Sequence, residues 1–156
     1  MIPRMSTALS PAARSAEFRF AQPITVRFND FDLLGHVNNA VYLTYCEMAR
    51  VGYWPAAAGD TMVEGASFIV AHISIDYRRP IQWHDSVQVC VRVSGVGSKS
   101  FTMEYRVLGA AGGEEFVAAE ARSVQVMYDY TAGRSIPLSD TLIARLEAFE
   151  GRPLRR

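Results

Sequence analysis

The chain has 156 residues, of which 49% are hydrophobic and 21% charged, and its 16 basic side chains balance its 16 acidic ones. This length suits one domain with a full core and is too short for two ordinary domains. Because the charges cancel and form no blocks of one sign, the composition argues against an electrostatic nucleic-acid binder, and no apolar run has the length of a membrane-spanning helix.

The two ends of the chain differ in composition from its middle. Residues 1–17 combine prolines and serines with small residues and lack the apolar core of a signal peptide, which predicts a disordered leader. Residues 18–150 carry all the periodic segments and form the single predicted domain. Residues 151–156 are a basic tail.

Two cysteines bear on the compartment and on metal binding. Cys46 and Cys90 lie at apolar-rich positions, and neither has metal-ligand spacing to the other or to the three histidines. We therefore expect two reduced, buried thiols, no metal site and a soluble protein of the cytoplasm.

The first predicted element is a strand from Phe18 to Asn29, in which apolar Ile24, Val26 and Phe28 alternate with polar residues. A loop from Asp30 to Val37 follows. Its Gly35 can adopt a backbone turn that other residues resist.

A helix is predicted over residues 40–54, with Asn38 or Asn39 as N-cap and with Gly52 or Pro55 ending it. Most of its circumference is apolar or aromatic, so it should be buried on most sides. Its strongly polar positions form one narrow stripe and are Thr44, Glu47 and Arg50. The last two are spaced to form an ion pair on the helix surface.

The rest of the chain consists of strands and one short helix. Three segments alternate strictly between apolar and polar residues, and a fourth changes parity near Ser123, which predicts a bulge there. These four predicted strands cover residues 68–78, 86–94, 101–107 and 116–128. A short amphipathic helix over residues 139–150 follows, capped by Ser139 or Asp140.

This order of elements predicts an α+β fold in which a long antiparallel sheet of about five strands wraps around one central helix, with a short C-terminal helix. One sheet covers only part of a helix that is apolar on most sides. The remaining apolar surface needs a second copy of the chain, so we expect a homodimer or a homotetramer.

The stretch from strand to helix reads Asp30-Phe-Asp32-Leu-Leu-Gly35-His36-Val-Asn38-Asn39-Ala-Val-Tyr. Further motifs are Glu-x-Ala-Arg on the helix, Asp-Tyr-Arg-Arg-Pro over residues 76–80 and Gly-Ser-Lys-Ser over residues 97–100. Together they resemble the hotdog-fold acyl-CoA thioesterases of the 4-hydroxybenzoyl-CoA thioesterase type. The resemblance covers residues 24–128 and implies a hotdog fold and hydrolysis of an acyl-CoA thioester to the free acid and CoA.

The resemblance also implies roles for the loop residues. Asp32 corresponds to the catalytic carboxylate, acting as nucleophile or as general base. The backbone amides of Asn39 and Ala40 would polarise the thioester carbonyl from the start of the helix, and Gly35 would let the loop approach it. His36 is interpreted as structural or as an edge of the substrate site rather than as a proton carrier.

Two other acids are kept as alternatives. Asp30 is expected to bond the loop backbone, although an exchange of roles with Asp32 stays open. Glu47 is the next candidate, because a related hotdog branch uses a glutamate on its central helix.

The resemblance implies CoA as part of the substrate and no separate cofactor. Its phosphates would meet basic and hydroxyl side chains. The candidates are Lys99, Ser98, Ser100 and Arg79. No nucleic-acid or membrane partner is expected.

Two other functions stay open. One is a hotdog protein that binds acyl-CoA or acyl carrier protein without hydrolysis. The other is an enoyl-CoA hydratase that uses Asp32 and His36. The acyl group is not specified by the sequence, but residues able to line an apolar tunnel are Phe31, Leu33, Leu34, Tyr42, Phe68 and Trp83.

Overall fold

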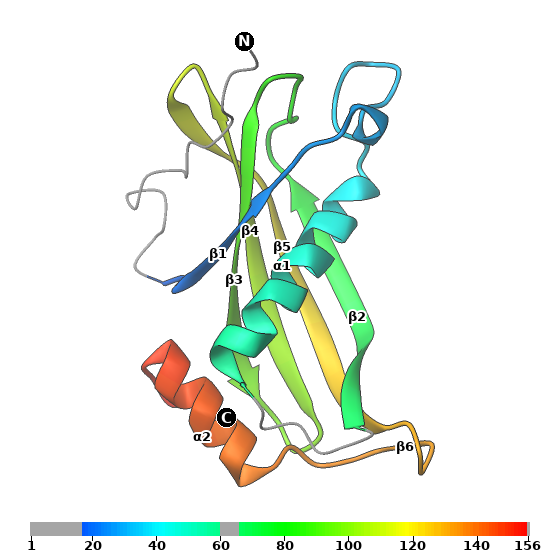
Figure 1. Cartoon of the computed structure of the whole chain (residues 1–156), viewed down its shortest axis with the longest axis vertical. Coiled ribbons are helices and arrows are strands. Elements are labelled where there is room, and N and C mark those ends of the chain that lie inside the picture. Colours follow the sequence, from blue (N-terminus) through cyan, green and yellow to red (C-terminus); the bar gives the residue numbers. More distant parts are fainter. Residues whose placement is uncertain (1–16, 60–65, 156) are drawn as a thin grey trace.

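The structure is a computed structural model that describes residues 17–59 and 66–155, so most of the predicted leader lies outside the described residues (Figure 1). The strands are β1 (Phe20–Ile24), β2 (Ala66–Tyr77), β3 (Ser86–Val96), β4 (Ser100–Ala111), β5 (Glu114–Asp129) and β6 (Arg134–Ser135), and the helices are α1 (Val41–Ala57), α2 (Asp140–Glu150) and the short 3-10 helix Phe28–Asp30. The antiparallel sheet has the order β1, β3, β4, β5, β2, and β6 pairs with β5 off this path. The predicted α+β hotdog architecture is confirmed.

Helix α1 lies across one face of the sheet because one side of it is apolar over its full length (Figure 1). Alternate residues of β3 face α1, and the four valines of β3 at these positions are buried. The buried helix residues include Cys46, and burial raises the pKa of its thiol to about 12. Cys90 is also buried, as predicted.

The far end of α1 is fixed by a buried carboxylate. The Tyr53 hydroxyl donates to Glu150 Oε1 at 2.6 Å, and the backbone amide of Val93 donates to the same oxygen at 3.0 Å. These bonds join α1, α2 and β3. Burial and the neighbouring Glu150 charge raise the pKa of Tyr53, so its hydroxyl stays a donor.

Two element boundaries differ from the sequence prediction. The first strand ends at Ile24 instead of Asn29, and the chain then forms the 3-10 helix, which leaves Phe28 79% exposed. The helix continues past Gly52 and Pro55 to Ala57. Proline is tolerated there because the carbonyl that loses its donor belongs to Val51, on the solvent side of the helix.

Bulges shift the register of three strands, β2, β3 and β5, and the extra residue of β3 lies between Val93 and Gly95. The extra residue of β2 lies between Val70 and His72, which places Phe68 and Val70 on the same face as Ile73. The alternation predicted for the first half of this strand was therefore wrong. A bulge was predicted in β5 near Ser123, but the irregularity lies between the partners of Val107 and Leu108, near Ala118.

The predicted ion pair between Glu47 and Arg50 is wrong. In the described part of the chain no ion pair joins them, and Glu47 is exposed while Arg50 is buried. The Arg50 guanidinium donates to the Tyr105 hydroxyl at 3.2 Å, which lies 2.8 Å from Ser123 Oγ. Hydroxyl groups on the sheet thus provide a partner that the helix sequence does not reveal.

We expect Tyr53→Phe to lower the free energy of unfolding by about 1–3 kcal/mol, because it removes a hydrogen bond to the buried Glu150 carboxylate. Urea denaturation monitored by circular dichroism measures this. Tyr130→Phe, at an exposed position, is the matched control and should leave stability unchanged. Equal stability of both variants would contradict the anchoring role of Tyr53.

Candidate active site

The loop between β1 and α1 is a small hairpin at one end of the sheet. Its stem is the bridge between Phe31 and Val37, closed by a bond of 2.8 Å from the Asp32 amide to the His36 carbonyl. The Gly35 amide donates to the Asp32 carbonyl at 3.1 Å, and Gly35 has a φ of 77°, which favours glycine. These backbone bonds and the Gly35 turn therefore fix the backbone conformation at Asp32.

The two oxygens of the Asp32 carboxylate differ in their bonding. Oδ1 accepts the amides of Leu34 at 2.9 Å and His36 at 3.2 Å. Oδ2 has no hydrogen-bond donor among the described residues, and the side chain is half-buried. Asp32 therefore orders its own loop with one oxygen and keeps the other available for a ligand.

Asp30 is bonded through both oxygens. Its Oδ1 accepts Arg27 Nε at 3.1 Å and Nη2 at 2.9 Å, and its Oδ2 accepts the Arg27 amide and the Tyr45 hydroxyl, each at 2.8 Å. Only 1% of the residue is exposed. Because its acceptor oxygens are occupied and buried, Asp30 is poorly placed to exchange roles with Asp32.

These bonds change the pKa values of both partners. Burial alone would raise the pKa of Asp30, but the hydrogen bonds from Arg27 and Tyr45 and the Arg27 charge outweigh burial and hold it below its ordinary value. Burial and the bond to Asp30 raise the pKa of Tyr45. Asp30 is thus ionised and Tyr45 neutral at neutral pH.

At the start of α1, one of the two backbone amides predicted as donors is open. The Asn38 carbonyl accepts the Val41 amide at 2.9 Å, and Asn38 Oδ1 accepts the Ala40 amide at 2.9 Å. Helix α1 begins at Val41, so Asn38 caps the turn that precedes the helix. The Asn39 carbonyl accepts the Tyr77 hydroxyl at 2.7 Å, whereas the Asn39 amide has no acceptor among the described residues. Of the two amides predicted as donors, only that of Asn39 is unoccupied.

A second loop supports the first. His36 bridges to Gln82, and the Val37 amide donates to the Ile81 carbonyl at 2.9 Å. The Ile81 amide in turn donates to the Tyr42 hydroxyl of α1 at 3.2 Å. The segment that leads into β3 therefore holds the hairpin against the start of the helix.

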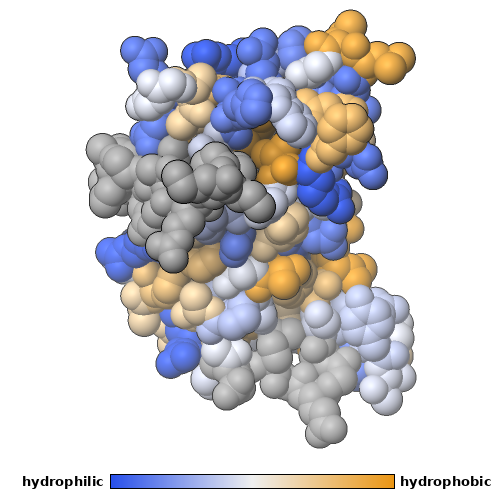
Figure 2. Space-filling view, turned by 45° about the horizontal axis from the view of Figure 1, so that its top comes forward, coloured by the Kyte–Doolittle hydropathy of each residue, from blue (hydrophilic) through white to orange (hydrophobic). Residues whose placement is uncertain are grey.

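An apolar cleft of about 660 Å³ opens beside Asp32. Its lining residues are Phe28, Phe31, Asp32, Leu33, Gly35, Asn38 and Trp83. In Figure 2, hydrophobic atoms gather at the upper right, over this end of the molecule. Phe28 was not among the predicted lining residues, because the strand pattern assigned it to the core.

The imidazole of His36 does not form a dyad with Asp32. Only the backbone amide of His36 contacts the carboxylate, and within the described residues no hydrogen bond joins the two side chains. His36 thus supports the loop through its main chain.

The predicted phosphate contacts lie in two places. Arg79 follows β2 at the Asp32 end of the sheet, with its guanidinium 4.0 Å from the centre of the Phe116 ring. The turn after β3 contains Ser98 and Lys99, and Ser100 begins β4. The Asp32 hairpin instead pairs with Gln82, just before the start of β3. Because β3 has 11 residues, the two sites in one chain are separated by roughly 35 Å at about 3.3 Å per residue.

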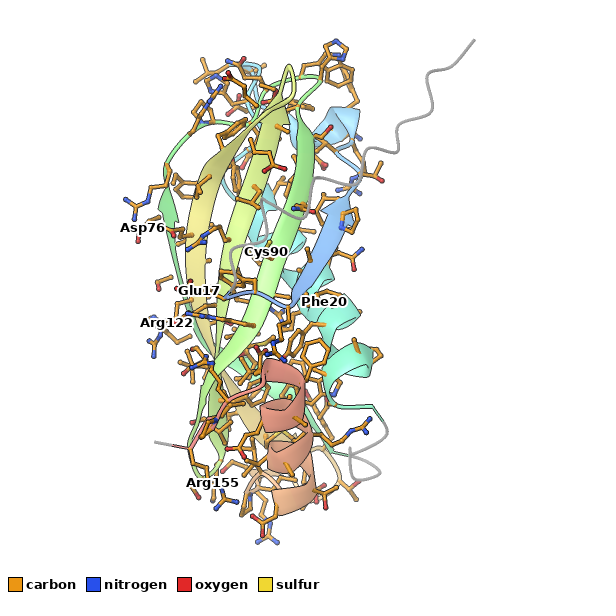
Figure 3. The ribbon with its side chains drawn as sticks, turned by 90° about the vertical axis from the view of Figure 1, so that its left-hand side faces the viewer. Glu17, Phe20, Asp76, Cys90, Arg122 and Arg155 are labelled. Carbon is orange, nitrogen blue, oxygen red and sulfur yellow. The ribbon has the colours of Figure 1, made fainter. Side chains whose placement is uncertain are left out.

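The sheet face away from α1 carries a second, polar cavity of about 220 Å³. Figure 3 shows Glu17, Asp76 and Arg122 on this side. Ion pairs cross it, including Arg92 with Glu104 at 2.5 Å. The cavity lies on the other side of the sheet from α1, and its acidic and basic side chains largely pair with one another.

Comparison with known proteins connects this geometry to a family. Residues 26–146 match the family model described as the thioesterase-like superfamily. The chain is 28% identical over 129 residues to the long-chain acyl-CoA thioesterase FadM of Escherichia coli (strain K12), covering 80% of this chain and 94% of FadM. It is also 28% identical over 123 residues to the uncharacterized protein YsmA of Bacillus subtilis (strain 168), covering 79% and 82% of the two chains.

A solved structure is similar over almost the whole chain. It is a thioesterase from Thermus thermophilus complexed with coenzyme A and Zn, with 42% sequence identity and a TM-score of 0.77, covering 90% of this chain and all of that one. The described residues of the present chain bring together no group of three or more His, Cys, Asp or Glu side chains suited to a metal ion. None of its described helices combines the length and apolarity needed to cross a membrane.

The bonding of Asp30 predicts a pH-dependent contribution to stability. Because its pKa is lowered in the folded state, this contribution is present above about pH 4, the ordinary range of an aspartate, and is lost as the pH falls through the lower folded-state value. We expect Asp30→Asn to cost about 1–3 kcal/mol at pH 7 and progressively less at lower pH.

Urea denaturation at a series of pH values measures this difference. Asp76→Asn, the same chemical change at an exposed strand position, is the control and should follow the wild type at every pH. A gap between wild type and Asp30→Asn that stays constant down to low pH would contradict the assignment.

Proposed function

The chain belongs to the thioesterase-like superfamily, and from this membership we propose that it hydrolyses acyl-CoA thioesters with Asp32 as the catalytic carboxylate. One observation carries the proposal. Asp32 lines the apolar cleft, its Oδ2 accepts no hydrogen bond from the described residues, and its hairpin is held against the start of α1. CoA is part of the substrate, and no further cofactor is needed.

The reaction requires little from the protein beyond this carboxylate. As a general base, Asp32 takes a proton from water while the water oxygen bonds to the carbonyl carbon. As a nucleophile, it attacks the carbonyl itself and forms an anhydride that water then hydrolyses. In both routes the carbon–sulfur bond breaks and CoA leaves as a thiolate, which needs little help from an acid.

The developing negative charge on the carbonyl oxygen needs a donor. The Asn39 amide suits this role because it lies just before α1 and has no acceptor among the described residues. A preorganised donor of this kind is worth about 3 kcal/mol in the transition state. The bond from Tyr77 to the Asn39 carbonyl holds this peptide unit in place.

The relatives support the substrate class. FadM is described as a long-chain acyl-CoA thioesterase, and the Thermus thermophilus thioesterase contains coenzyme A. The hydratase alternative is less well supported, because it needs the imidazole of His36 next to Asp32, and the two side chains do not contact each other in the described structure. A protein that binds acyl-CoA without hydrolysis would show tight binding and no release of thiol.

The proposed CoA contacts of Ser98, Lys99 and Ser100 require a second subunit, because these residues lie roughly 35 Å from the Asp32 end of their own chain. Strand β2 is an edge strand of 12 residues that exposes apolar side chains, including Val70. Two β2 edges related by a two-fold axis would pair antiparallel, which brings the far end of one subunit next to the Asp32 end of the other. We therefore propose a homodimer or a larger homo-oligomer in which the partner contributes Ser98, Lys99 and Ser100.

We expect Asp32→Asn to reduce kcat/KM for acyl-CoA hydrolysis by about 10²–10⁴-fold, because the variant can neither attack the carbonyl nor accept a proton from water. Release of free thiol from a panel of acyl-CoA thioesters measures it, and circular dichroism reports on the fold. Asp76→Asn is the matched control with normal turnover. Undiminished hydrolysis by folded Asp32→Asn would refute the assignment and direct attention to Glu47.

Lys99 is the only lysine of the chain, which permits a selective test of the CoA contact. If the Lys99 ammonium binds a CoA phosphate, saturating CoA should slow its acylation by an amine-reactive reagent at least several-fold. Peptide mass spectrometry measures the rate, and the N-terminal amine is an internal control that should react equally with and without CoA. Equal modification of Lys99 under both conditions would contradict the contact.

A further inference from the structure

The turn that leads into β3 has an unusual backbone. His84 has a φ of 76° and is the only residue other than glycine with a positive φ among the described residues. Such a conformation is unfavourable for an L-amino acid. Two bonds hold the turn closed, from the Gln82 amide to Asp85 Oδ2 at 2.8 Å and from the Asp85 amide to the Gln82 carbonyl at 3.2 Å.

This strained turn presents Trp83 to the cleft. The centre of the Trp83 side-chain ring lies 5.1 Å from that of Phe31, 6.0 Å from that of Phe28 and 5.4 Å from that of His84. The side chain is nevertheless 51% exposed. The rings of Phe28, Phe31 and Trp83 therefore form an aromatic wall of the cleft, which Asp32 also lines.

The lining of the cleft restricts what can occupy it. Among the described lining residues Asp32 is the only charged side chain, and neither lysine nor arginine is present. A phosphate or carboxylate would find no cation there and would meet the Asp32 charge. The amide groups of the pantetheine arm would find few polar partners along the aromatic wall, whereas an apolar group would lose water-exposed surface on both sides.

We propose that the acyl group of the substrate is apolar, that it occupies this cleft, and that Trp83 is the residue that determines this specificity. The inference rests on the proposed thioesterase function. The volume of about 660 Å³ lies within the range of roughly 300–1,000 Å³ that is typical of small-molecule sites. It accommodates an aryl or extended aliphatic acyl group and leaves a short acyl group with little contact to the rings.

Steady-state kinetics test the specificity. Wild-type protein should prefer phenylacetyl-CoA and octanoyl-CoA to acetyl-CoA. Trp83→Ala should lower kcat/KM for the first two by about tenfold, equivalent to roughly 1.4 kcal/mol, and change the value for acetyl-CoA less than about twofold, because a short acyl group makes little contact with the ring. Trp83→Phe should keep most of the preference. An equal loss for all three substrates, or the absence of a preference in the wild type, would overturn the proposal.

Trp54→Phe is the matched control. Trp54 is the only other tryptophan of the chain, and it packs against Phe68 and Phe101 rather than on this cleft. It should leave the substrate preference unchanged. A Trp54→Phe variant that loses the preference in the same way would overturn the assignment to Trp83.

A binding measurement separates failure of this inference from failure of the proposed function. In the double variant Trp54→Phe with Asp32→Asn, Trp83 is the only tryptophan and hydrolysis is blocked. Octanoyl-CoA should change the Trp83 emission in a saturable way, and CoA alone should not. If the wild type hydrolyses no thioester but this change occurs, the function fails and the apolar acyl site stands.

Two further results would overturn the site. An equal emission change with CoA alone would identify the pantetheine arm as the occupant. A fall in the molar mass of Trp83→Ala in light scattering would identify the aromatic wall as a contact between copies of the chain.

Discussion

The structure of the site depends on the buried carboxylate of Asp30. Its bonds to Arg27 and Tyr45 join the start of the 3-10 helix to the central helix, and the backbone carbonyl of Asp30 accepts the Asn38 amide at 2.8 Å. Both sides of the hairpin are thereby fixed on α1. A loop of this length without such a bond would lose the defined position of Asp32 relative to the helix start, and positioning is a large part of what a single carboxylate can contribute to catalysis.

The two aspartates of the loop differ in how their carboxylates are bonded. Asp30 is buried and bonded through both oxygens, whereas Asp32 keeps one oxygen free beside the cleft. Two backbone amides at the helix start differ in the same way. The Ala40 amide donates to Asn38 Oδ1, whereas the Asn39 amide has no acceptor among the described residues. The Asp32 carboxylate and the aromatic wall therefore border one cleft, although Trp83 comes from a different segment of the chain.

Periodicity was sufficient to predict the sheet, the central helix and the C-terminal helix, in which Ser139 accepts the Leu142 amide as an N-cap. It failed where tertiary contacts decide the outcome. Phe28 continues the alternation of a strand, but the bonds of Asp30 turn the chain into a 3-10 helix and expose the ring. Arg50 has the spacing of a surface ion pair, but the hydroxyl of Tyr105, 55 residues away, draws it inward. The position of Asp32 was predictable from its motif, whereas the free oxygen and the separation from Lys99 required the fold.

The most direct test of the central claim is a crystal structure with an acyl-CoA analogue in which a methylene group separates the carbonyl from the sulfur, so that hydrolysis is impossible. We predict that the carbonyl oxygen lies about 3 Å from the Asn39 amide, that Asp32 Oδ2 faces the carbonyl carbon, and that the acyl chain lies against Trp83. A carbonyl bound next to Glu47, with Asp32 remote from it, would contradict the assignment of Asp32.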